Sequence, residues 1–317
     1  MPNTFPGVEP FETGVLEVGD GQSLYWEARG NPDGVPAVVL HGGPGSGCTS
    51  DDGRLLDPGL YRIILFDQRG CGRSRPRVNA TTELSSNTTE HLISDIERLR
   101  QHRGIERWVL VARSWGVTLA LAYAERYPER VIAMVLASIT MTRRADIHWL
   151  YHEVGRYFPQ EWQRLRSGVP EDERRGDLVA AYHRLLNEQP YVTCREQAAL
   201  NWCRWEDAVS PLPGGVPNSR YDDSAFRMTF ARIVTHYFHH CAWLTEDQLL
   251  RDAHRLAGIP GVLIHGRFDL GGPLDSAWQL AEAWADADLR VVDTGHSGGD
   301  AMTAGIVEAT NRYAILG

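Results

Sequence analysis

Residues 108–125 read WVLVARSWGVTLALAYAE, and this stretch decides the fold. Its first five residues, Trp108 to Ala112, are apolar strand formers of the kind found in a strand that is buried on both faces. Residues 117–125 are mostly small and apolar and favour a helix. Ser114 lies at the junction, where a tight turn would raise its hydroxyl above the sheet at the positive end of the helix. The stretch therefore predicts a strand–serine–helix unit.

The flanking sequence supplies further strands and helices. Residues 13–28 alternate as an antiparallel hairpin does, residues 88–101 have helical spacing, and a closing helix is expected over residues 305–313. Short apolar runs that end in turn residues predict buried strands, and they occur at residues 37–40, 62–66, 131–136, 261–266 and 289–293. This alternation of predicted strands and helices predicts an α/β fold with a mostly parallel central sheet flanked by helices.

The residue composition and the hydrophobic pattern change between residues 140 and 243. Strand signals are few there, whereas Trp, Tyr, Arg and Glu recur with helical periodicity around a Pro/Gly-rich break at residues 211–217. We interpret residues 140–243 as a helical cap subdomain. It would be inserted into a core domain made of residues 1–139 and 244–317.

Composition excludes several classes of function. The apolar fraction of 43% and the charged fraction of 23% are typical of a soluble globular protein. The net charge of −9, without an acidic or basic block, argues against a nucleic-acid partner. No long apolar run or basic-then-apolar start predicts membrane insertion or a signal peptide. Five scattered cysteines without a C-x-x-C pattern predict free thiols and a cytoplasmic location.

The serine has partners where nucleophilic catalysis needs them. The pattern Ala112-x-Ser114-x-Gly116, with alanine as the first small residue, is similar to the nucleophile elbow of α/β-hydrolases. Asp269 and His296 each follow a later predicted strand, and the order Ser, Asp, His is that of the α/β-hydrolases. His296 would take the serine proton and Asp269 would orient the imidazole, so a catalytic triad is predicted.

A glycine-rich loop, HGGPG at residues 41–45, follows the first parallel strand. Such a loop brings a backbone N–H close to a developing oxyanion, so the amides of Gly43 and Trp115 are the predicted oxyanion hole. The loop lacks the ending of a phosphate-binding loop, and no cofactor is expected.

Each of these features also has an interpretation without catalysis. The glycines could form an ordinary loop, Asp269 could be a turn residue, and His296 is one of twelve histidines. His236, His239 and His240 share a helical face, and a metal site is an alternative interpretation of these residues. Because no carboxylate or cysteine pair accompanies them at ligand spacing, no metal is expected.

Several longer strings add a resemblance that covers nearly the whole chain. They are HGGPGSG at residues 41–47, FDQRGCGRS at 66–74, SWG at 114–116, WE at 205–206, HYF at 236–238 and GHS at 295–297. With these strings the chain resembles the proline iminopeptidase (prolyl aminopeptidase) family of serine peptidases. The resemblance implies a metal-free exopeptidase that removes an N-terminal proline from short peptides, and its triad falls on Ser114, Asp269 and His296. It also implies that Glu206, in the cap, binds the terminal amine.

The sequence departs from the family pattern close to the expected substrate. Val234 replaces a second cap glutamate, Thr140 and Leu150 replace aromatic residues that wall the proline ring, and Phe238 is retained. Losing one of two carboxylates around an ammonium removes about 1.5–3 kcal/mol, which corresponds to a roughly ten- to hundredfold loss of discrimination for a free N-terminus.

Three further residues leave alternatives open. Glu153 or Asp207 could replace the lost carboxylate, and Val234 could instead open room for a larger substrate. Arg113 places a bulky cation beside the nucleophile, either as a solvated or salt-bridged side chain or as part of the site.

The leading hypothesis is a serine aminopeptidase or amidohydrolase that acts through an acyl-enzyme on a small peptide or amide with a free N-terminal amine. An alternative is a biosynthetic tailoring hydrolase acting on an amide, ester or aminoacyl group of a larger metabolite. A non-catalytic ligand-binding homologue is the third hypothesis. The expected assembly is a monomer or a small homo-oligomer.

Overall fold

A computed structural model describes residues 4–210 and 218–316. The Pro/Gly-rich break predicted at residues 211–217 lies outside the described residues. Within the described part of the chain, no helix is both long and apolar enough to cross a membrane.

The centre of the molecule is an eight-stranded sheet with the order β1-β2-β4-β3-β5-β6-β7-β8. β1 and β2 form the predicted antiparallel hairpin, β2 also pairs antiparallel with β4, and all other neighbours are parallel. The strands are β1 (Glu12–Gly19), β2 (Gln22–Gly30), β3 (Val35–Leu40), β4 (Tyr61–Phe66), β5 (Trp108–Ser114), β6 (Val131–Ile139), β7 (Gly261–Gly266) and β8 (Ala287–Val292). The predicted fold class, a mostly parallel sheet flanked by helices, is confirmed.

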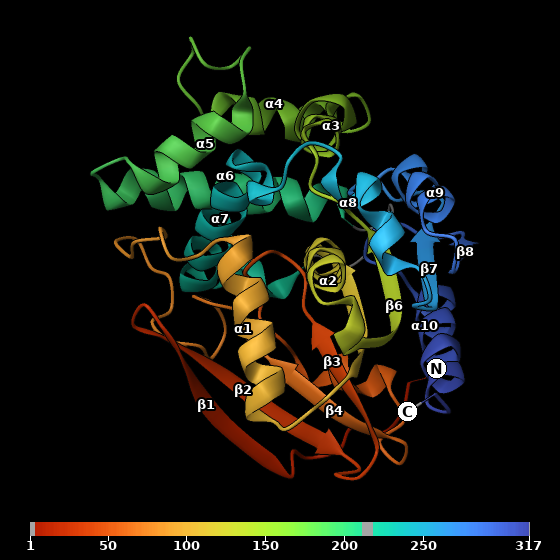
Figure 1. The fold of residues 1–317 in the computed structure, drawn as a ribbon. Helices are drawn as coiled ribbons and strands as arrows, with labels where there is room; N and C mark the ends of the chain where they lie inside the picture. The colour runs from red at the N-terminus through yellow and green to blue at the C-terminus, as the bar shows by residue number, and fades with distance from the viewer. Residues whose placement is uncertain (1–3, 211–217, 317) are drawn as a thin grey trace.

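Helices cover both faces of the sheet (Figure 1). α1 (Thr89–His102), α2 (Trp115–Arg126) and α9 (Leu274–Ala283) share one apolar cluster with strand residues such as Val38 and Leu40. α10 (Asp300–Tyr313) packs on the opposite face with Ala37 and Val39. Successive residues of β3 thus enter different clusters, as expected for a strand buried on both faces. A short helix, α8 (Gln248–Arg251), precedes β7.

The chain between β6 and β7 folds into a separate group of helices. These are α3 (Arg144–His148), α4 (Pro159–Ser167), α5 (Leu178–Asn187), α6 (Val192–Val209) and α7 (Ser224–His239). They have their own apolar core, in which Trp202, Trp205 and Tyr182 are fully buried. Figure 1 shows them gathered over one end of the sheet.

The turn between β5 and α2 is tightly constrained. Ser114 has a φ of 53° and a ψ of −128°, a conformation that is uncommon for a residue with a side chain. At Gly116, a Cβ atom would lie 2.1 Å from the carbonyl oxygen of Leu40 in the neighbouring strand. Ala112 is 1% exposed, and its small side chain fits where the elbow pattern usually has glycine. The close approach of α2 to β3 therefore requires glycine at position 116.

We expect Gly116→Ala to lower the free energy of unfolding by about 3 kcal/mol, because the added methyl group meets rigid backbone. Gly305→Ala, in helix α10, is the matched control. Its Cβ would meet nothing nearer than 3.4 Å, so it should be neutral or stabilise by up to about 1 kcal/mol. Urea denaturation of the three proteins measures both changes, and equal stability of wild type and Gly116→Ala would contradict the constraint.

Candidate active site

Ser114, His296 and Asp269 come together at the carboxyl end of the sheet. Ser114 ends β5, whereas Asp269 and His296 lie on the loops after β7 and β8. Ser114 Oγ is 2.8 Å from His296 Nε2, and His296 Nδ1 is 2.9 Å from both carboxylate oxygens of Asp269. The three side chains thus form a continuous hydrogen-bonded chain, which is the arrangement that activates a serine hydroxyl.

The protonation of His296 follows from its partners. An ionised carboxylate only accepts hydrogen bonds, so His296 Nδ1 donates to Asp269 and Nε2 is free to accept the serine proton. Burial lowers the pKa of His296, but the charge and hydrogen bond of Asp269, together with the charge of Glu206, raise it more. The net effect is a pKa above the usual value, which favours the imidazolium form needed after proton transfer.

Groups around the triad hold its two loops. The amides of Gly271 and Gly272 donate to Asp269 Oδ1 at 2.8 and 2.9 Å. His265 is fully buried, accepts from the amide of Ile139 at 2.9 Å and donates through Nε2 to the carbonyl of Gly272 at 2.8 Å. His265 thereby ties the Asp269 loop to β6.

The loop that carries His296 has its own anchor. The hydroxyl of Ser138, in β6, donates to the carbonyl of His296 at 2.8 Å. Sequence reasoning gave no role to Ser138 or His265. Their positions at the ends of β6 and β7 were the only available signal.

The predicted oxyanion residues, Gly43 and Trp115, line the same cavity as Ser114. Gly43 has a φ of +116°, which glycine adopts readily. Gln68 links this loop to the nucleophile helix, because its side chain donates to the carbonyl of His41 and accepts from the indole of Trp115, both at 3.0 Å. Sequence reasoning missed this function of Gln68, although the residue lies within the quoted FDQRGCGRS string.

Two cavities meet at the serine. They share five lining residues, which are Gly43, Ser114, Glu206, Ser210 and His296. The first holds about 530 Å³ of space, including its opening to solvent, and has an apolar side formed by Ile147, Leu150, Val209 and Phe238. The second is more polar and is lined by Arg113, Asp207 and Arg220 among others. A scissile bond held at Ser114 would thus have a separate space on each side.

Four of the five predicted substrate-binding residues line the first cavity: Glu206, Phe238, Thr140 and Leu150. Val234 does not line either cavity within the described part of the chain. It is 1% exposed and packs in the apolar core of the helices above the sheet. The hydroxyl of Tyr151 donates to Glu206, and burial raises the pKa of that carboxyl group despite this bond and the charge of His296.

Other carboxylates near the site have partners of their own. Glu153 pairs with Arg156 at 3.0 Å, and Asp207 lines the second cavity and accepts from the amide of Asn218 at 2.7 Å. Asp146, which sequence reasoning did not single out, lines the first cavity but is paired with Arg143 at 2.9 Å. Among the described residues, Glu206 is therefore the carboxylate on the wall of the first cavity that lacks an ion pair with an arginine.

Arg113 is half-buried beside the nucleophile. Its guanidinium donates to the carbonyl of Ser297 at 2.9 Å, and no carboxylate lies within 4 Å of it in the described ranges. Of the two alternatives, the side chain is neither salt-bridged nor fully solvated. The Arg113 side chain contacts Ser297, the residue that follows His296. Arg113 also lines the second cavity.

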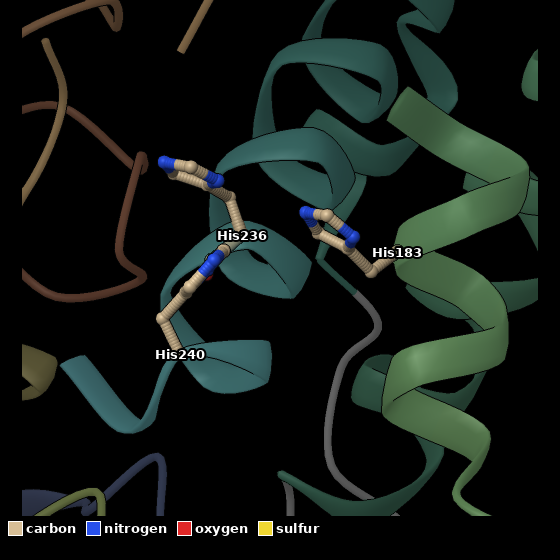
Figure 2. A group of neighbouring side chains, drawn as sticks. All are labelled: His183, His236 and His240. Atoms are coloured by element: carbon tan, nitrogen blue, oxygen red, sulfur yellow. The ribbon is translucent and has the colours of Figure 1, made fainter. Parts of the chain in front are cut away.

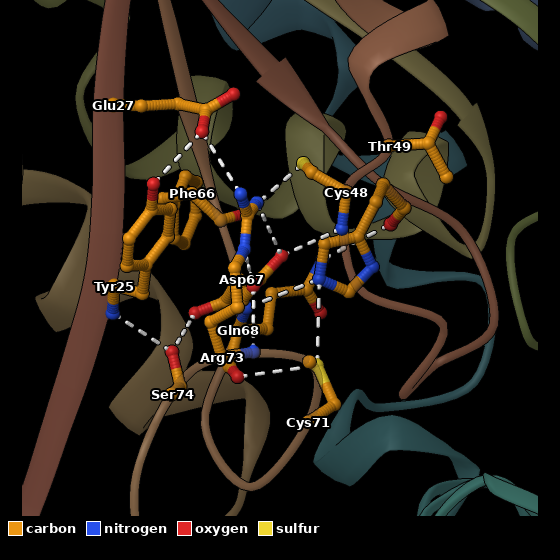
Figure 3. A network of polar contacts seen from close by, with 12 residues as sticks. Tyr25, Glu27, Cys48, Thr49, Phe66, Asp67, Gln68, Cys71, Arg73 and Ser74 are labelled. Atoms are coloured by element: carbon orange, nitrogen blue, oxygen red, sulfur yellow. Dashed lines mark hydrogen bonds and ion pairs between the residues drawn. The ribbon is translucent and has the colours of Figure 1, made fainter. Parts of the chain in front are cut away.

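A buried carboxylate, Asp67, holds the two loops on the other side of the site (Figure 3). It accepts from the amides of Cys48 and Arg73 and from Arg73 Nε, at 2.7, 2.8 and 2.8 Å. Arg73 also reaches Glu27 in β2 at 2.9 Å. Burial raises the pKa of Asp67, but the hydrogen bonds from Arg73, with the other nearby donors and charges, lower it more, so the net pKa is below its usual value.

Comparisons with known proteins agree with the observed fold and with the family resemblance of the sequence motifs. A family model described as the α/β-hydrolase fold matches residues 36–300, so the chain is an α/β-hydrolase by fold. A probable proline iminopeptidase of Streptomyces coelicolor is 47% identical over 316 residues, which cover 98% of this chain and 97% of the relative. A proline iminopeptidase of Xylella fastidiosa is 46% identical over 301 residues, 94% of each chain. The chain therefore belongs to the proline iminopeptidase family, as the resemblance predicted.

A solved structure shares the fold at lower identity. The proline iminopeptidase of Mycobacterium smegmatis superposes with a TM-score of 0.64 and 19% identity, over 96% of this chain and 99% of that one.

We expect Asp67→Asn to destabilise the protein by about 2–3 kcal/mol at pH 7, because two backbone amides and the Arg73 guanidinium lose a buried charged acceptor. The folded pKa of Asp67 lies below the unfolded value of about 3.9, so its contribution is present above that value and is lost as pH falls through the folded pKa. Urea denaturation at pH 7 and pH 3 should therefore show a smaller difference between wild type and variant at pH 3.

The control for this prediction is Asp51→Asn, which breaks an exposed ion pair with Arg54 and should cost less than about 1 kcal/mol. A wild-type-like free energy of unfolding for Asp67→Asn at pH 7 would contradict the role given to the buried carboxylate.

Proposed function

We propose that this protein is a serine aminopeptidase that removes an N-terminal proline, or another small aminoacyl group, from short peptides or amides. The observation that carries the proposal is the hydrogen-bonded chain from Ser114 through His296 to Asp269, located where two cavities meet. Relatives of 46–47% identity over nearly the whole chain bear the name proline iminopeptidase, and this supports the same activity over the tailoring-hydrolase and ligand-binding alternatives.

In the proposed reaction Ser114 Oγ attacks the scissile carbonyl while His296 Nε2 takes the hydroxyl proton. Asp269 stabilises the resulting imidazolium, and the amides of Gly43 and Trp115 donate to the oxyanion. His296 then gives its proton to the departing amine, which leaves an acyl-enzyme on Ser114. Water attacks this ester with the same groups in reverse roles and releases the amino acid.

The two cavities would orient the substrate, with its N-terminal residue in one cavity and the rest of the peptide in the other. The aminoacyl group would occupy the first cavity, where the Glu206 carboxylate would pair with its ammonium group. The rest of the peptide would leave through the polar second cavity beside Arg113. Val234 is buried in the apolar core and Asp207 lines only the second of the two cavities, so we propose Glu206 as the single carboxylate for the amine.

The remaining parts of the proposal concern domains and location. We propose that residues 140–243 act as a cap subdomain on a core of residues 1–139 and 244–317, because the helices between β6 and β7 have a core of their own. The five cysteines are free, which supports a reducing cytoplasm, where short peptides with free N-termini are the expected substrates.

The direct test replaces the nucleophile. Ser114→Ala should abolish hydrolysis of prolyl- and alanyl-naphthylamide, because no acyl-enzyme can form, and should retain the wild-type unfolding curve. Ser210→Ala, which changes another serine on the same cavity wall, is the control and should keep most of the activity. Full activity of Ser114→Ala would exclude the mechanism.

A second test separates amine recognition from bond cleavage. Glu206→Gln should lower kcat/KM for prolyl-naphthylamide by roughly ten- to hundredfold, since a charge-assisted contact is lost. Turnover of 4-nitrophenyl acetate, which has no amine, should stay close to wild type. Asp207→Asn is the neighbouring control and should change neither rate by more than a few-fold. If both substrates lose activity equally in Glu206→Gln, the carboxylate is not the amine site.

A further inference from the structure

Helices α5 and α7 bring three histidines together away from Ser114. His183 comes from α5, His236 from α7, and His240 directly follows α7 (Figure 2). One ring nitrogen of each lies within 4.8 Å of those of the other two. His236 is buried, His183 is half-buried and His240 is exposed, so the group spans from the interior to solvent.

The hydrogen bonds of the rings leave lone pairs free. His240 Nδ1 lies 2.8 Å from the carbonyl of His236, and a carbonyl only accepts, so Nδ1 carries the proton and Nε2 has the lone pair. His183 Nδ1 lies 4.0 Å from a carboxylate oxygen of Glu188, which is longer than a hydrogen bond. A carbonyl on the second nitrogen, as at His240, is a usual support of a metal-binding histidine.

Aromatic packing explains why rings gather here, but it does not explain why these rings are imidazoles. His183 stacks on His239 at 4.4 Å, and His240 stacks on Trp243 at 4.6 Å. Phenyl rings would serve such contacts without polar nitrogens.

We propose that His183, His236 and His240 form a binding site for a divalent transition metal ion of the zinc type. Imidazole nitrogens favour Zn²⁺ and its neighbours, whereas Ca²⁺ and Mg²⁺ need oxygen ligands that this cluster lacks. Two histidines four residues apart on one helix turn, with a third from the adjacent helix, supply three ligands, and the exposed side at His240 leaves a fourth position for water.

Binding of a metal ion would require only a small movement of the three imidazole rings. Zinc–nitrogen bonds of about 2.0–2.1 Å in a tetrahedral site place ligand nitrogens roughly 3.4 Å apart. The present separations of up to 4.8 Å would therefore close by somewhat more than 1 Å. The three side chains would share this movement, and His240 is the exposed one at the end of its helix.

A bound ion would join α5 to α7. Because Phe238, on the last turn of α7, lines the first cavity, the ion would also restrain one wall of the proposed acyl pocket. The site itself does not depend on the proposed function, since none of its ligands belongs to the triad.

The test uses the full-length protein after treatment with a chelator. Titration with ZnCl₂ followed by calorimetry should give one tight equivalent per chain, and Zn²⁺ should raise Tm because it binds the folded state. Co²⁺ should give the intense visible absorption of a tetrahedral site. His240→Ala and His183→Ala should each weaken Zn²⁺ affinity by more than about tenfold and remove the Tm increase.

The control is His254→Ala, which removes an exposed histidine whose Nδ1 also bonds a backbone carbonyl, and it should bind Zn²⁺ like wild type. His240 is exposed, so its variant should remain folded and is decisive even if His183→Ala is not stable. No stoichiometric binding by wild type, or equal binding by wild type and His240→Ala, would overturn the proposal.

Discussion

The close packing of α2 against β3 is the constraint on which the rest of the site depends. Gly116 lies against the carbonyl oxygen of Leu40, and no other residue could let the helix begin so near the strand. The turn that results gives Ser114 its positive φ and aims its hydroxyl out of the sheet. A Cβ atom at Gly116 would also lie 3.1 Å from the carbonyl oxygen of His41, so the same contact holds the loop of His41 to Gly43 beside Ser114. The position of Ser114 is in this sense a consequence of backbone packing.

The sheet and the triad could be predicted because both follow from local pattern and parallel topology. Buried parallel strands are short apolar runs, and their carboxyl ends lie at one edge of the sheet. Ser114, Asp269 and His296 each follow such a run, so residues distant in sequence were expected to converge. Hydrogen bonds of 2.8–2.9 Å now join them.

The wall of the substrate cavity was harder to predict, and α7 shows why. Every residue from Met228 to Tyr237 is buried, including polar ones such as Arg232, so the polar residues of this helix do not mark a solvent-facing side that would reveal its orientation. Val234 and Phe238 are about one helical turn apart, and the sequence predicted that both would line the substrate-binding cavity. Only Phe238 reaches the cavity, because the cavity lies at the end of the helix. His183 joins His236 and His240 through packing of α5 on α7, which neither sequence segment encodes alone.

On the proposed function, Glu206 would link amine binding to the charge state of His296. Its negative charge is one of the causes that raise the pKa of His296, and burial raises its own pKa in turn. A substrate ammonium paired with Glu206 would offset that charge. The offset disfavours the imidazolium form of a free His296, so binding of an N-terminal amine would keep the imidazole neutral and able to accept the serine proton. A single carboxylate would then contribute both to recognition of the amine and to the protonation state of the proposed base.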